Sequence, residues 1–176
     1  TGTLTAAGSD SKFYNLTLAA SGQTTTINTR RPKVTNILTF NGGTAAGDQP
    51  IDLDSTNANP LSINVSTVMT FPEIALNVIG NPINIPSYDG YPFLNVAHLS
   101  SGATVYLVAS GGITATSMNI AATYDSVTFD MNGQDMTLNG GLTFANGGDE
   151  TSILTTNGGA LTVNGNLNMN WSGTNT

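Results

Sequence analysis

Two pairs of carboxylates have spacings that could support chemistry. Asp52 and Asp54 are separated by one residue, so an extended strand would place both side chains on one face. Asn57 follows closely, and carboxylate and amide oxygens are the ligands that calcium prefers. The segment lacks the glycine and the distal glutamate of an EF-hand loop, so it predicts only a weak calcium site at Asp52, Asp54 and Asn57, and no other cofactor.

The second pair, Asp130 and Asp135, flanks the Asn132-Gly133 turn, which could bring the two acids together. Paired acids are the catalytic groups of glycoside hydrolases. Enzymes that cleave acidic polysaccharides normally also place basic side chains beside the acids. Here the four lysines and arginines all lie before residue 34, so we expect no catalytic residues in this chain.

His98 is the only histidine, and the chain contains no cysteine. A zinc site needs several His or Cys ligands, and a histidine-based triad would need all its other members to converge on this one position. His98 lies in an apolar, strand-like segment, where a packed or surface histidine is the simpler interpretation. The prediction is a protein that is not an enzyme.

Aromatic residues give the strongest indication of a binding surface. Tyr88, Tyr91 and Phe93 lie close together in a proline-rich segment, and Trp171 lies near the end of the chain. Aromatic rings offer flat apolar faces on which sugar rings can stack. These four residues are therefore the candidate binding surface, and glycans are candidate partners.

Charge limits the partners further. Charged residues make up 9% of the chain, against about 25% in an average soluble domain, and the net charge is −7. Such a surface repels phosphate backbones and anionic membranes, and no run of about 18 apolar residues is present to span a membrane. We expect no nucleic-acid partner and no membrane insertion, whereas neutral glycans or copies of the chain itself fit this surface.

An internal repeat organises the elements that must carry these residues. Residues 136–144 read MTLNGGLTF, and residues 161–169 repeat the pattern as LTVNGNLNM at a spacing of 25 residues. Alternating apolar residues on each side of the Asn-Gly pair predict two short strands, each with one buried face. The Asn-Gly pair is expected to supply the positive φ that bends the chain between them.

Related segments recur from residue 13 onwards and predict about six or seven rungs of about 22–26 residues each. One rung cannot bury its own apolar face, so the pattern predicts a single all-β solenoid domain over residues 1–176. Residues 69–99 break the pattern with three prolines in eleven residues, which predicts an irregular insertion. The alternative fold is a β-sandwich with strand exchange between subunits.

The segments 36–43 and 159–167 resemble the repeats of secreted bacterial β-helical surface proteins, a class that includes adhesins, autotransporter passengers and filament-forming exoproteins. The resemblance covers about two thirds of the chain. It implies a right-handed parallel β-helix, extracellular or on the cell surface, that serves as a stalk, a fibre or an adhesive surface. It transfers no functional residues to positions of this sequence.

The expected function is a non-enzymatic extracellular structural or adhesive module, namely a fibre, stalk or filament subunit that assembles end to end. Uncapped solenoid ends expose unpaired backbone groups and apolar core, so other copies or adjoining repeat domains are the expected partners. Since the chain starts at Thr1 rather than Met, we expect a processed mature chain or an excerpt of a longer repeat protein. The alternative function is a β-helix protein that binds carbohydrate or cleaves polysaccharide.

Overall fold

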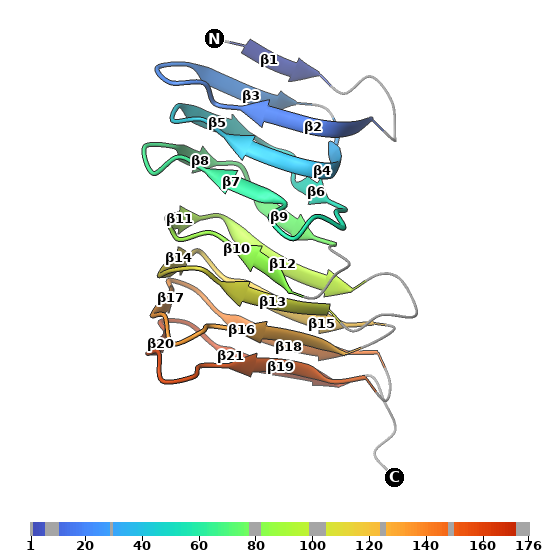
Figure 1. Ribbon diagram of the computed structural model, residues 1–176, viewed down its shortest axis with the longest axis vertical. Coiled ribbons are helices and arrows are strands. Elements are labelled where there is room, and N and C mark those ends of the chain that lie inside the picture. Colours follow the sequence, from blue (N-terminus) through green and yellow to red (C-terminus); the bar gives the residue numbers. More distant parts are fainter. Residues whose placement is uncertain are drawn as a thin grey trace.

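The computed structural model describes residues 2–5, 11–28, 30–77, 82–98, 105–123, 126–147 and 150–171. These residues form 21 strands and no helix, wound into a right-handed parallel β-helix of about six turns (Figure 1). Every ladder between these strands is parallel, so the predicted solenoid is confirmed and the alternative β-sandwich is wrong. The described residues include no apolar helix of membrane-spanning length.

Four parallel sheets form the walls of the solenoid. The long sheet runs from end to end and contains β2 (Lys12–Leu18), β4 (Lys33–Phe40), β6 (Ile51–Leu53), β7 (Leu61–Ile63), β9 (Glu73–Leu76), β12 (Phe93–His98), β15 (Met118–Ala122), β18 (Leu142–Asn146) and β21 (Leu167–Trp171). The amino-terminal sheet contains β1 (Gly2–Thr5), β3 (Thr24–Asn28), β5 (Thr44–Gly47) and β8 (Val68–Thr70).

The two remaining sheets belong to the C-terminal half. The β10 sheet contains β10 (Ile83–Ile85), β13 (Val105–Ala109), β16 (Val127–Asp130) and β19 (Ser152–Thr155). The β11 sheet contains β11 (Tyr88–Tyr91), β14 (Ile113–Ala115), β17 (Met136–Leu138) and β20 (Leu161–Val163). Each turn of this half crosses the β10 sheet, the β11 sheet and the long sheet in that order, so every turn contributes three short strands to the wall.

Alternation along each strand builds one apolar core inside the walls. In β13, for example, Val105, Leu107 and Ala109 are buried while the two residues between them are only half-buried. Stacking the strands in register places such inward side chains on top of one another, and the resulting core is continuous along the solenoid. Each fully buried Leu or Ile contributes about 1.5–3 kcal/mol relative to its exposed state.

The repeat at 136–144 and 161–169 is confirmed at the level of single residues. Met136 pairs with Leu161 and Leu142 pairs with Leu167, so the two copies stack without a gap. The turn before them has one residue fewer between its strands, since Ile113 pairs with Met136 and Met118 with Leu142. In these turns the rung length therefore varies at a corner while the strands on both sides stay in register.

The Asn-Gly pairs inside the two repeat copies, at 139–140 and 164–165, act differently from the prediction, unlike the Asn-Gly pairs at 132–133 and 157–158. Gly140 and Gly165 do not adopt a positive φ. They are needed because adjacent turns meet there, and a Cβ on Gly165 would lie 2.6 Å from the carbonyl carbon of Gly140. Positive φ is found instead one corner earlier, at Asn132 and Asn157, with values of 52° and 49°.

Residues 69–99 do not form an insertion where the structure describes them. β9 pairs with β6 before it and with β12 after it, and β12 pairs in turn with β15. Pro82, Pro86 and Pro92 each lie directly outside a strand, where the missing N–H costs no ladder bond. The predicted insertion is therefore wrong, because the prolines mark corners of regular turns. Residues 78–81 and 99 lie outside the described residues.

The middle of the solenoid nevertheless contains a discontinuity, here called the seam. Among the described strands, β7 and β8 pair only with strands that precede them in the chain, and β10 and β11 pair only with strands that follow them. The β9–β12 ladder is the one that crosses between the two halves in this part of the chain (Figure 1). Three single bonds between described residues outside that ladder support it. The Tyr88 hydroxyl donates to the Thr67 carbonyl at 2.5 Å. Asn84 N–H donates to the Ala58 carbonyl at 2.8 Å, and the Asn84 side-chain amide donates to Asn59 Oδ1 at 3.0 Å.

Candidate functional site

The C-terminal end of the solenoid exposes its core. β19, β20 and β21 each have one ladder neighbour among the described strands, so one edge of each strand is unpaired. Leu167 and Met169 stack on the inward residues Leu142 and Phe144, yet they are 59% and 60% exposed. One turn earlier, Leu142 is only 1% exposed. The last turn thus has the same inward pattern as the preceding one without a further turn to cover it.

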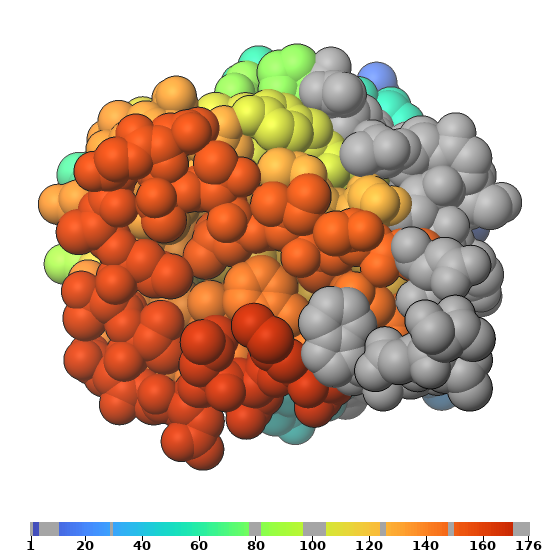
Figure 2. All heavy atoms as spheres, turned by 90° about the horizontal axis from the view of Figure 1, so that it is seen from below, coloured from blue at the N-terminus to red at the C-terminus, as the bar shows by residue number. Residues whose placement is uncertain are grey.

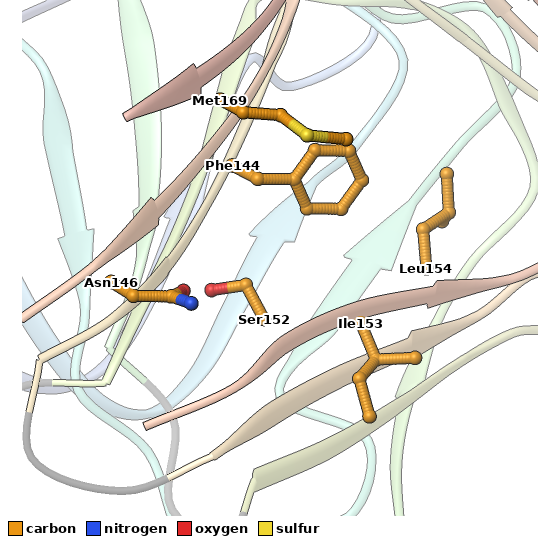
Figure 3. Close-up of a pocket in the computed structure, with 6 residues that line it drawn as sticks. All are labelled: Phe144, Asn146, Ser152, Ile153, Leu154 and Met169. Carbon is orange, nitrogen blue, oxygen red and sulfur yellow. The ribbon is translucent and has the colours of Figure 1, made fainter. Parts of the chain in front are cut away.

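A hollow of about 280 Å³ opens in this end, and Figure 2 shows it framed by the last turn. It is lined by Phe144, Asn146, Ser152, Ile153, Leu154 and Met169. Phe144 and Met169 lie against each other on one side and Leu154 points toward them, whereas Ile153 points away on the opposite side of its strand (Figure 3). The centre of the end is therefore apolar.

Ser152 gives the hollow a small polar margin. Its hydroxyl donates to the Ala145 carbonyl at 3.0 Å and accepts the Ala122 N–H at 3.1 Å, so both of its hydrogen-bonding roles are used within the protein. The Asn146 side chain points toward it (Figure 3). Residues 151–171 contain no charged side chain, so the strands of the last turn are neutral, and Glu150 shortly before β19 is the nearest described charge along the chain.

The N-terminal end differs in that its core is covered. Leu16 and Leu18 of β2 point inward, in register with Leu38 and Phe40, and are only 8% and 3% exposed. The outward residue Tyr14 is 71% exposed. Among the described residues of the two ends, the open apolar core is therefore at the C-terminal end.

The calcium candidates are held by protein partners. Arg31 Nε lies 2.6 Å from Asp52 Oδ1, and Lys33 Nζ lies 2.6 Å from Asp54 Oδ2. The Asn57 amide donates to the Asn36 side chain at 2.9 Å and does not join the two carboxylates. Burial raises the pKa of Asp52 above its usual value, and the Arg31 charge works against that increase. These residues form a cross-strand ion-pair cluster, with Arg31 also bonded to Glu73 at 3.2 Å.

The aromatic candidates do not form a shared surface. Tyr88 and Tyr91 lie in the core, where their rings meet edge to face at 5.1 Å between centroids. The Tyr91 hydroxyl donates to the Pro86 carbonyl at 2.8 Å. The prediction of stacking surfaces at Tyr88 and Tyr91 is therefore wrong, while Phe93 is half-buried on the long sheet. The side chains of Trp171 and His98 lie outside the described residues.

A second depression, of about 440 Å³, lies at the seam and follows the corner between the β11 sheet and the long sheet. It is lined by Gly47, Asp48, Met69, Thr70, Phe71, Pro72, Gly90, Tyr91, Pro92 and Thr116. Asp48 is the single acid among them, so the lining does not supply the pair of carboxylates that glycoside hydrolysis requires. No group of three or more His, Cys, Asp or Glu within the described ranges is placed to hold a metal ion.

Asp130 and Asp135 each fix a corner of the chain. Asp130 accepts hydrogen bonds from the Tyr106 hydroxyl, from the Asn132 N–H at 2.6 Å and from the Asn157 amide at 2.7 Å. Asp135 Oδ1 accepts the Ala160 N–H at 2.9 Å. Both carboxylates thus connect one turn to the next by hydrogen bonds. From the sequence, only their position beside an Asn-Gly pair was evident.

This arrangement predicts an acid-dependent loss of stability. The hydrogen bond from Tyr106, more than any other contact, lowers the pKa of Asp130 below its usual 3.8. A lowered pKa in the folded state stabilises the fold above the unfolded-state value, and this contribution disappears as the pH falls through the folded-state pKa. We expect Asp130→Asn to be less stable than the wild type at about pH 7, and the difference to be smaller at about pH 2.5, below the usual value of 3.8. Urea unfolding at both pH values measures this, and a difference that does not change with pH would contradict it.

Comparisons with family models, curated proteins and solved structures find no match to this chain. The most distinctive feature of the structure is the open C-terminal end, whose last three strands carry no charge.

Proposed function

We propose that this chain is a non-enzymatic structural module that assembles end to end, as part of a fibre, stalk or filament outside the cell. The observation that carries the proposal is the open C-terminal end, where Leu167 and Met169 are more than half exposed beside three unpaired strand edges. A bare parallel edge with apolar inward residues is a template for another strand. Natural edges are usually protected by charges or prolines, and residues 151–171 contain neither.

The energetics favour covering this end. Burying an exposed Leu or Met side chain contributes about 1.5–3 kcal/mol each, and pairing the strand edges adds hydrogen bonds of about 0.5–1.5 kcal/mol each. The low charge and the Asn, Thr and Gly-rich outer surface suit a rigid spacer. The location outside the cell is supported by the repeat chemistry alone, and surface labelling of intact source cells tests it.

The double variant Leu167→Lys/Met169→Lys tests the assembly. We expect the wild-type chain to show concentration-dependent association by analytical ultracentrifugation, and the variant to raise the dissociation constant by about 100-fold or more, because two charges would have to enter an apolar contact. Val65→Lys is the matched control, since Val65 is 86% exposed in a lateral turn and should leave association unchanged. A wild-type chain that stays monomeric at every concentration would contradict the proposal.

A further inference from the structure

We infer that the open C-terminal end binds the same end of a second copy, with β21 pairing antiparallel to β21 of that copy about a two-fold axis at Met169. This inference rests on the proposed end-to-end assembly and specifies its partner and orientation. Because a two-fold contact closes at two copies, it narrows that proposal from a fibre or filament to a short stalk. The resulting assembly is a rod of two solenoids with an N-terminal end at each tip. A head-to-tail stack would instead place β2 of one copy on β21 of the next.

The contrast between the two ends supports this orientation. A head-to-tail contact needs an open N-terminal core opposite the open C-terminal core. Leu16 and Leu18 are already covered at the N-terminal end, so the described inward residues of β2 offer little apolar area to a partner. The C-terminal end of a second copy is the one described surface of this chain that has a matching open core, around Met169 and Leu154.

The side-chain pattern of β21 is compatible with antiparallel self-pairing. Leu167 and Met169 continue the inward columns of Leu142 and Phe144, and Asn168 continues the outward column of Thr143. An antiparallel pair centred on Met169 places Met169 opposite its own copy and Asn168 opposite Asn170 of the second copy. Inward residues then face inward in both copies, because opposite residues of a pair project to the same face of the sheet.

The distribution of charge along the chain limits electrostatic repulsion between two C-terminal ends. The chain has a net charge of −7, which would repel a second copy over much of the surface. Residues 151–171 carry no charge, so the strands β19, β20 and β21 of two C-terminal ends meet without like charges, while Glu150 lies half-buried before β19. At the other end, Lys12 lies on β2, and lysine on an edge strand opposes further pairing.

Cysteine cross-linking distinguishes the two orientations, because the natural chain has no cysteine. Asn168→Cys and Asn170→Cys are mixed in equal amounts and oxidised, and each variant is also oxidised alone. Directly opposite residues have Cα separations of about 4.5–5.5 Å, which a disulfide can bridge. We expect a covalent dimer in up to about half of the mixed sample, since random mixing pairs unlike chains half of the time, and little in either variant alone.

The head-to-tail arm uses Asn168→Cys mixed with Lys12→Cys or with Tyr14→Cys, which lie on the edge that would then face β21. Cross-linking in this arm overturns the two-fold pairing but leaves end-to-end assembly standing. Association without cross-links in either arm also overturns it, because another surface then makes the contact. Absence of association in the wild type overturns the proposed function itself. Asn168 and Asn170 are exposed, so circular dichroism should show both variants folded like the wild type.

Discussion

Tyr91→Ala is expected to lower the free energy of unfolding by about 3–5 kcal/mol, because it removes a large side chain from a closely packed core. Tyr91 is 1% exposed, its ring packs against Tyr88, and its hydroxyl bonds to the Pro86 carbonyl. The cavity would open beside the seam, where a single ladder joins the two halves. Urea unfolding followed by circular dichroism measures the change.

Two further variants define the origin of that loss. Tyr14→Ala removes a tyrosine that is 71% exposed, and we expect a change within about 0.5 kcal/mol. Tyr91→Phe keeps the ring and removes the hydroxyl, which leaves the Pro86 carbonyl without this donor and should cost about 1–3 kcal/mol. Similar small effects for Tyr91→Ala and Tyr14→Ala would show that Tyr91 is a surface residue, as the sequence suggested.

The tyrosines illustrate where sequence reasoning fails. Tyr88 and Tyr91 occur near prolines, which suggested an exposed loop, but the prolines lie at corners and the tyrosines lie on the strand between two of them. The sequence carries the burial signal only weakly, because Tyr88 and Tyr91 are three residues apart rather than two. Both are buried because a positive φ of 124° at Gly90 and a register shift in β11 interrupt the alternation between them.

The sequence predicted the architecture more completely than it predicted the candidate site. The pairing of Met136 with Leu161 follows directly from an ungapped repeat, since identical spacing on both sides of a corner preserves register. The burial of Leu16 was not predictable, because it lies on β2, the first strand of the long sheet, where a repeat pattern alone predicts an open edge. The partners of Asp52 and Asp54 were also missed, although Arg31 and Lys33 precede them by 21 residues each and pairing across one turn brings them together.

The seam gives the second large effect: Asn95→Pro is expected to split unfolding into two transitions. Phe93 N–H bonds back to the Pro72 carbonyl and Leu94 N–H bonds forward to the Ser117 carbonyl, so the alternation of a parallel strand directs the Asn95 N–H back to β9. Proline removes that donor from the one described ladder that crosses the seam. A loss of about 3 kcal/mol corresponds to a fall of about 12–24 °C in the unfolding midpoint of the less stable half, which has fewer than about 100 residues.

Asn119→Pro is the matched control, because Met118 N–H bonds forward to the Gly141 carbonyl and the Asn119 N–H is therefore directed back to β12. The turns on either side of that bond are also joined by the β10–β13 and β11–β14 ladders, so this variant should lower a single midpoint without separating the halves. Hydrogen exchange resolved by segment measures both variants. If the two prolines produce the same exchange pattern, the halves are coupled through the core rather than through the β9–β12 ladder. The seam would then not divide the chain into two units that unfold separately.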